Sequence, residues 1–187
     1  MSTGFRYLVR MDLWRCMGAA SLPLFVKAWF VDPAFRPVFT LRLCQALSPA
    51  TGAWKRPLFV LARLWHVRTQ ARCGVDLPWT LRVGPGFKLL HGWGIVINDL
   101  TVIGANVTVM QGVTIGGTAR GIPVLQDDVI VCANATIVGA VTVGRGAVVG
   151  AACCVNRDVA QDSTVVGNPQ RALAQRTPPR GFNRAPL

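Results

Sequence analysis

The sequence contains no glutamate, only two histidines and one tyrosine, so few of its side chains can carry acid–base chemistry. Its six cysteines show no C-x-x-C or disulfide-framework spacing, which indicates reduced thiols and a cytoplasmic protein. Two histidines cannot form a three-histidine zinc site, and we predict no metal. No charge-free apolar run reaches the roughly 18 residues that span a membrane, and the N-terminal residues are not typical of a secretory signal.

Positive charge is concentrated in the N-terminal part. Residues 1–82 hold 12 of the 20 Lys and Arg residues and three Asp, which gives +9 of the net +12. Aromatic residues are interleaved with this charge, and the spacing of Leu58, Leu61, Leu64 and Trp65 suits an amphipathic helix. The pattern fits a helical cap on the rest of the chain or on a neighbouring subunit, peripheral contact with an inner-membrane surface, or a platform for a polyanion. No recognition motif accompanies the charge, so we predict no nucleic-acid partner.

A six-residue repeat runs through the second half of the chain. Each repeat opens on an aliphatic residue, and the fifth position is mostly small or β-branched. The opening residues are Val83, Leu89, Ile97, Ile103, Val109, Ile115, Leu125, Val131, Ile137, Val143, Val149 and Val155. This period is typical of a parallel β-helix, in which each hexapeptide forms one side of a triangular prism. Twelve repeats at three per turn predict about four coils.

The organisation that follows has three parts. Residues 1–75 are expected to form a basic, aromatic-rich region of short helices, broken at Pro23, Asp32-Pro33, Pro37, Pro49 and Pro57. Residues 76–173 form the β-helix domain, with the repeats proper from 83 to 160 and a lead-in before them. Residues 174–187 form a Pro- and Arg-rich tail that we expect to be mobile. The predicted fold class is therefore mainly β, a β-helix behind a helical N-terminal region.

Two repeats are too long, and they carry the candidate chemistry. The eight-residue repeat LLHGWGIV holds His91 on a bulge with Gly92 and Gly94, where it projects outward and is the natural general base. The alternative is a histidine that only packs at a surface, and we expect such a structural role for His66. The ten-residue repeat IGGTARGIPV opens on Gly116 and Gly117, whose backbone can approach a phosphate or pantetheine arm closely, with Arg120 nearby.

Residues 76–173 resemble the serine acetyltransferase-like branch of the hexapeptide-repeat acyltransferases. The matching segments are GVDLPWTLRVGPGFKLLHGWGIVIND, VTVMQGVTIGGT, the VCANA and VGAAC repeats and VVGNPQRAL. The resemblance implies a left-handed β-helix, acetyl-CoA as cosubstrate and a homotrimer with sites between neighbouring prisms. It also implies that His91 is the base and that Asp76 orients it. The coenzyme groove it implies is lined by Gly116, Gly117, Thr118, Ala133 and Ala151.

The chain departs from the serine enzymes at three places. The Asp that precedes the family's catalytic His is Leu90 here, and the family's second His has no counterpart in ARGIP. The N-terminal carboxylates that bind serine align only loosely, with Asp32 as a candidate. The segment HGWGIVIN resembles the exopolysaccharide and colanic-acid O-acetyltransferases instead. Trp93 suits a sugar face or packs against the next subunit, and Asn98 and Asp99 are predicted to face the substrate.

The sequence thus predicts an acetyl-CoA-dependent O-acetyltransferase that acts on a sugar hydroxyl of a surface glycan or its lipid-linked precursor. His91 would deprotonate the hydroxyl, and backbone N–H groups near Gly116 and Gly117 would stabilise the oxyanion. Three alternatives stay open. They are serine acetylation in cysteine biosynthesis, acetylation of another small hydroxyl acceptor such as an antibiotic or a nucleotide sugar, and a non-catalytic β-helix scaffold.

Overall fold

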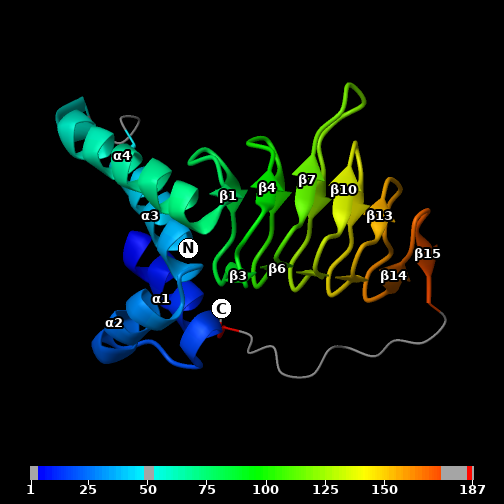
Figure 1. The fold of residues 1–187 in the computed structure, drawn as a ribbon, viewed down its shortest axis with the longest axis horizontal. Coiled ribbons are helices and arrows are strands. Elements are labelled where there is room, and N and C mark those ends of the chain that lie inside the picture. Colours follow the sequence, from blue (N-terminus) through cyan, green and yellow to red (C-terminus); the bar gives the residue numbers. More distant parts are fainter. Residues whose placement is uncertain (1–3, 49–52, 174–184, 187) are drawn as a thin grey trace.

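The computed structural model describes residues 4–48, 53–173 and 185–186. Within them, four α-helices gather at one end of a three-sided β-helix, and Figure 1 shows the strands stacked along the long axis. The helices are α1 (Phe5–Met17), α2 (Leu22–Val31), α3 (Phe35–Leu47) and α4 (Arg56–Cys73), with the short 3₁₀ helix η2 (Ala53–Lys55) before α4. The predicted fold class is confirmed.

The prolines act differently from what the sequence predicts. Pro23, Pro37 and Pro57 do not break helices but lie in the first turns of α2, α3 and α4. A first turn tolerates proline because its N–H groups have no partner within the helix. Asp32 and Pro33 do separate α2 from α3, as predicted. Pro49, the other predicted break, lies outside the described residues.

Three parallel sheets form the sides of the prism. Sheet A holds β1 (Val75–Asp76), β4 (Ile95–Ile97), β7 (Thr114–Gly116), β10 (Thr136–Val138) and β13 (Cys154–Val155). Sheet B holds β2 (Arg82–Val83), β5 (Val102–Ile103), β8 (Val124–Leu125) and β11 (Thr142–Val143). Sheet C holds β3 (Lys88–Leu90), β6 (Thr108–Met110), β9 (Ile130–Val131), β12 (Val148–Val149), β14 (Thr164–Val166) and the antiparallel β15 (Arg171–Ala172).

The β-helix has about five coils, one more than the repeat count predicts. The additional sides come from strand β1 before the first recognisable repeat and strand β14 after the last one. All the aliphatic residues that open the repeats are buried except Val83, which is half-buried and packs against the same core. Helix α3 contributes Val38 and Leu41 to that core, so helices and prism share one hydrophobic interior.

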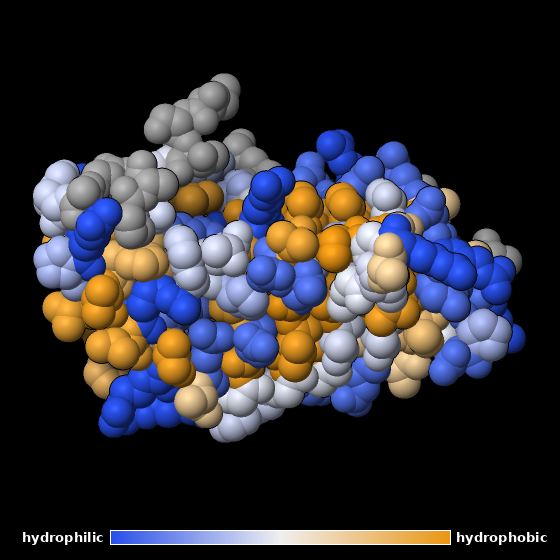
Figure 2. Space-filling view, turned by 90° about the horizontal axis from the view of Figure 1, so that it is seen from above, coloured by the Kyte–Doolittle hydropathy of each residue, from blue (hydrophilic) through white to orange (hydrophobic). Residues whose placement is uncertain are grey.

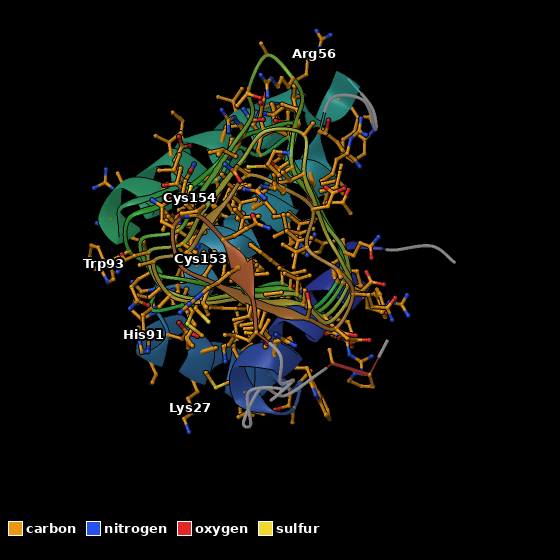
Figure 3. The ribbon with its side chains drawn as sticks, turned by 90° about the vertical axis from the view of Figure 1, so that its right-hand side faces the viewer. Lys27, Arg56, His91, Trp93, Cys153 and Cys154 are labelled. Carbon is orange, nitrogen blue, oxygen red and sulfur yellow. The ribbon has the colours of Figure 1, made fainter. Side chains whose placement is uncertain are left out.

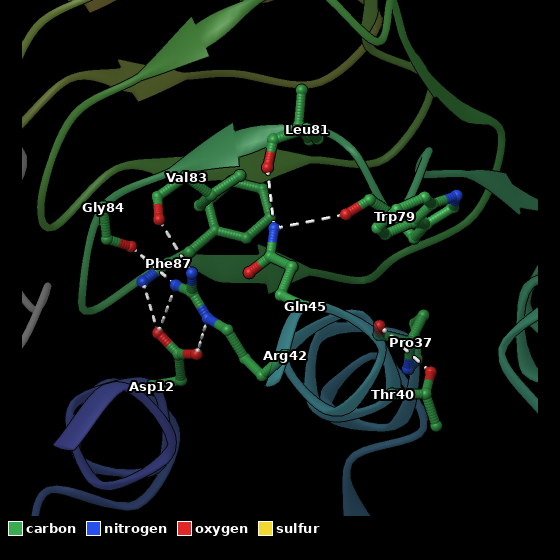
Figure 4. Close-up of polar contacts among 10 residues, drawn as sticks. All are labelled: Asp12, Pro37, Thr40, Arg42, Gln45, Trp79, Leu81, Val83, Gly84 and Phe87. Atoms are coloured by element: carbon green, nitrogen blue, oxygen red, sulfur yellow. Dashed lines mark hydrogen bonds and ion pairs between the residues drawn. The ribbon is translucent and has the colours of Figure 1, made fainter. Parts of the chain in front are cut away.

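A buried ion pair fastens the helices to the first coil (Figure 4). Arg42 of α3 donates from Nε to Asp12 Oδ2 of α1 at 2.8 Å and from Nη2 to Oδ1 at 3.2 Å. Its guanidinium also donates to the carbonyl oxygens of Val83 and Gly84, at 2.7 and 2.6 Å. The Asp12 carboxylate also accepts a hydrogen bond at Oδ1 from the Phe87 N–H, at 2.9 Å. Charge pairing therefore sets how the helices sit on the prism.

His66 has the structural role expected of it. It is fully buried on the inner face of α4, with Nδ1 2.8 Å from Thr40 Oγ1 and Nε2 2.8 Å from the Leu77 carbonyl oxygen. Thr69 Oγ1 lies 3.0 Å from the same Thr40 hydroxyl. Burial lowers the pKa of His66 because the charged imidazolium would lose its hydration.

We expect His66 to make the fold sensitive to mild acid. Below the ordinary histidine pKa of about 6.5, His66 binds a proton in the unfolded chain but stays neutral in the folded chain, so the free energy of unfolding falls as pH falls. The unfolding free energy should drop between pH 7.5 and 5.5, with a slope of up to about 1.4 kcal/mol per pH unit. Urea titrations at several pH values measure it. His66→Gln should flatten the profile, and equal slopes in wild type and His66→Gln would contradict the assignment.

Two further predictions concern membrane-spanning segments and the C-terminal tail. No helix in the described part of the chain is long and apolar enough to cross a membrane. The tail predicted to be mobile lies outside the described residues, apart from Ala185 and Pro186. Ala185 is buried, and its N–H donates to the side-chain oxygen of Asn106 at 3.1 Å.

Candidate active site

His91 lies at the corner where sheet C turns into sheet A. Its φ of 54° is in the left-handed region, as it is for Asn134 and Ala152 at later corners between the same two sheets. The Trp93 N–H closes the turn on the His91 carbonyl oxygen at 2.7 Å. A Cβ at Gly92 would lie 2.9 Å from Ala34 Cβ, so only glycine lets α3 approach this corner. Figure 3 shows His91 and Trp93 projecting outward at the same corner.

A hollow of about 320 Å³ opens beside His91, between this corner and the start of α3. Three polar side chains of different kinds line it: the His91 imidazole, the Asp32 carboxylate and the Lys88 ammonium. The Ala34 N–H donates to Asp32 Oδ1 at 3.1 Å, and Lys88 Nζ donates to the Arg15 carbonyl oxygen at 3.0 Å. No ion pair joins Asp32 to Lys88 among the described residues.

The cysteines near this hollow are not activated thiols. Burial raises the pKa of Cys16, and the neighbouring Asp32 carboxylate raises it further. Burial also raises the pKa of Cys73, whose thiol donates to the Pro33 carbonyl oxygen. A thiol held protonated is a poor nucleophile, so His91 remains the candidate base among the side chains that line this hollow. All six cysteines of the chain are free, as the spacing predicts.

A second, larger hollow of about 840 Å³ lies on the outer face of sheet A, under α4. It contains five of the residues predicted to act in the site: Asp76, Asn98, Asp99, Gly116 and Gly117. The Asn98 side chain accepts from the Leu100 N–H at 3.0 Å and so shapes its own turn. Arg63 of α4 adds positive charge to the rim, with its guanidinium 5.6 Å from the centre of the Trp79 ring.

The glycine turn leads into a narrow hairpin. Thr118 and Gly121 exchange both backbone hydrogen bonds, at 2.9 and 3.0 Å, and Arg120 is exposed at the tip. In the described residues the N–H of Gly117 donates no hydrogen bond, which leaves it available to a ligand. A Cβ at Gly117 would meet the far end of the Ile122 side chain, so a larger residue there would require that side chain to move.

The predicted residues gather at the two ends of the strands of sheet A, that is, at two different corners of the prism. At the corner with sheet C, which holds His91, lie Trp93, Ala133 and Ala151, and hydrogen bonds such as Ala152 N–H to the Ala133 carbonyl oxygen join the coils there. At the corner with sheet B lie Asn98, Asp99, Gly116, Gly117, Thr118 and Arg120.

Asp76 lies on β1, the edge strand of sheet A nearest the helices, where it pairs in register with Val96. No hydrogen bond or ion pair joins it to His91 within the described chain, and the two line different hollows. Their catalytic pairing therefore stays a prediction, as do the roles of the other site residues.

Lys88 is the charged residue that sequence reasoning missed. It is the sole lysine after Lys55, and it lies three residues before His91. Alternation along β3 turns Leu89 inward and leaves Lys88 and Leu90 partly exposed. The position of this single lysine close to His91 in the sequence was the signal that could have identified it. Asp32 was noted only as a loose match, and the structure brings it to the same hollow.

Comparisons with known proteins agree with this architecture. The chain is 40% identical over 155 residues to a serine acetyltransferase of Bacillus pumilus, covering 77% of this chain and 71% of that protein. Soybean serine acetyltransferase complexed with serine superposes with a TM-score of 0.75 at 29% identity, over 92% of this chain and 70% of that one. The Brucella abortus enzyme in complex with coenzyme A gives 0.76 at 25% identity, over 94% and 70%. No model of a protein family matches the chain.

The fold and these likenesses define an O-acetyltransferase that uses acetyl-CoA as the acetyl donor. The chain belongs to the serine acetyltransferase family. The expected closeness to exopolysaccharide O-acetyltransferases finds no support in these comparisons, and neither does a role in polysaccharide biosynthesis.

Proposed function

We propose that the protein acetylates the hydroxyl group of L-serine, with acetyl-CoA as donor. The observation that carries the proposal is the 320 Å³ hollow in which Asp32, Lys88 and His91 meet. A free amino acid carries one ammonium and one carboxylate, and the hollow offers one carboxylate and one ammonium beside a base. Its volume is at the small end of the range for small-molecule sites. The relatives named above are serine acetyltransferases.

This proposal replaces the argument for a glycan acceptor. That argument rested on Leu90 in place of the family's Asp, on the missing second histidine, and on a strongly cationic N-terminal region in which the serine-binding carboxylates align only loosely. Asp32 supplies a carboxylate next to His91. Lys88, held by the Arg15 carbonyl oxygen, supplies a positive charge for the serine carboxylate.

The proposed reaction is a direct transfer. Neutral His91 accepts the proton of the serine hydroxyl as the oxygen attacks the thioester carbonyl carbon. The tetrahedral intermediate collapses, the C–S bond breaks, and the coenzyme A thiolate takes the proton back from the imidazolium. The products are O-acetylserine and free coenzyme A. The Gly117 N–H is a candidate donor to the oxyanion.

We also propose that the working form is a homotrimer with sites between neighbouring prisms. In one chain, His91 and the glycine turn at Gly116 and Gly117 lie at opposite ends of the strands of sheet A, at different corners of the prism. A site that uses both groups on one pair of substrates needs the turn of one prism next to the histidine of another. This arrangement matches what the family resemblance implies.

We expect an acceptor screen to single out L-serine over sugars, nucleotide sugars and oligosaccharides at equal concentration. Asp32→Asn and Lys88→Met should each raise KM for serine at least tenfold, because each removes a charge-assisted hydrogen bond to the substrate. The KM for acetyl-CoA should stay within about twofold in both variants. A continuous assay of the coenzyme A thiol that the reaction releases measures these constants.

Lys27→Met is the matched control, since Lys27 is exposed on α2 outside this hollow. It should leave KM for serine unchanged. Efficient acetylation of a sugar with serine unreacted would overturn the proposal and restore the glycan acceptor.

A further inference from the structure

The outward faces of α2 and α4 are apolar and exposed. On α4, Leu61 and Leu64 are each 63% exposed, whereas the inner face buries Ala62 and His66. On α2, Phe30 is 72% exposed, and only Ala28 is buried. The apolar stripe that the sequence predicts on α4 therefore points away from the prism.

The two apolar faces form one surface, which we call the helical end face. Trp29 of α2 and Trp65 of α4 have ring centres 5.5 Å apart. Between the helices lies an apolar hollow of about 290 Å³. It is lined by Phe25, Val26, Trp29, Phe30, Phe39 and Trp65. Figure 2, which looks down on the side of α4, shows hydrophobic groups at the helical end of the molecule, with hydrophilic groups beside them.

Positive charge borders this apolar surface. Lys27 is exposed on α2, and Arg56, Arg68 and Arg72 are exposed on α4. Neither helix contains an acidic residue. Of the two acidic residues in the helices and their connections, Asp12 is buried in its pair with Arg42, and Asp32 lines the hollow at His91. The charge around the helical end face is thus of one sign.

We propose that the helical end face docks on the surface of an anionic lipid bilayer. Exposed aliphatic and aromatic side chains enter the interface between headgroups and acyl chains, the arginines meet lipid phosphates, and the apolar hollow takes part of an acyl chain. A second copy of this chain fits the face less well, because it would bring two cationic surfaces together without acidic partners. The contact is peripheral, and no residue that lines the apolar hollow also lines the hollow at His91.

The test is flotation of the full-length protein with two kinds of vesicles. Vesicles with 30% phosphatidylglycerol in phosphatidylcholine should bind it at least tenfold more strongly than pure phosphatidylcholine, and 0.5 M NaCl should reverse most of this binding. Replacing Arg68 by Gln should weaken binding about fivefold, and Arg68→Gln/Arg72→Gln by more, since each cation near an anionic surface adds about the same factor. Leu61→Asp/Leu64→Asp should abolish binding while acetyl transfer in solution continues.

Leu100→Asp is the matched control, because Leu100 is also 63% exposed but lies on the prism. It should bind vesicles like the wild type. Absence of binding to anionic vesicles would overturn the proposal. So would Leu61→Asp/Leu64→Asp splitting a larger assembly into smaller ones in light scattering, since that result would assign the face to a second copy. Equal loss of binding in Leu100→Asp would also overturn it.

Discussion

His91→Asn lowers kcat for acetyl transfer by about 10² to 10⁴, the usual contribution of a general base, and leaves coenzyme A binding unchanged. Asparagine tolerates the left-handed backbone at this position, so the variant removes the base without disturbing the turn. His91→Ala should lose activity to the same extent. Steady-state rates with saturating acetyl-CoA, together with calorimetry of coenzyme A binding, measure the two effects separately.

Trp93→Phe is a suitable control for this experiment, because it changes the neighbouring exposed ring at the same corner and keeps the imidazole. It should keep kcat within about tenfold of the wild type. Wild-type kcat in both His91 variants would remove His91 from the mechanism. Absence of coenzyme A binding by the wild-type chain would favour the non-catalytic scaffold.

Arg42→Met is expected to be the most destabilising single change in the helical region. It leaves the Asp12 carboxylate buried without its cation and the Val83 and Gly84 carbonyl oxygens without a donor. Breaking a buried pair from one side costs about 3–5 kcal/mol, which for a chain of this size lowers Tm by roughly 6–20 °C. Differential scanning calorimetry gives Tm directly.

The surface pair of Arg145 and Asp127 provides the comparison. Its N–O distance is 3.4 Å, and its side chains are 61% and 42% exposed. Exposed pairs contribute about 0–1 kcal/mol, so Arg145→Met should leave Tm nearly unchanged. Equal shifts in the two variants would show that the Asp12–Arg42 pair does not hold the helices on the prism.

The prism was predictable because its signal is local and repeated. Each hexapeptide buries its own opening aliphatic residue against the next coil, so the period survives without any long-range information. The first and last sides were missed because β1 and β14 lie next to irregular segments that interrupt the count. In the structure β1 pairs with β4 and β14 pairs with β12, and these pairings, which the sequence pattern does not show, make both strands part of the prism.

The candidate site was predictable only in part. The eight-residue repeat marked His91 because an extra turn at a corner breaks the period. Asp32 could not be assigned with it, since one residue belongs to the helices and the other to the prism. The buried Asp12–Arg42 pair, which connects α1 and α3 to the first coil, fixes how these parts meet.

The sequence by itself determined the β-helix, the outward histidine, the basic N-terminal region and the acetyltransferase resemblance, because each is a pattern among neighbouring residues. The tertiary structure alone decided that Asp32 and Lys88 share a hollow with His91 and that Asp76 lines a different one. It also decided that the apolar stripe of α4 faces outward, because the opposite face is engaged by Thr40 and Leu77 through His66. These outcomes depend on contacts between segments far apart in the chain, which no local pattern encodes.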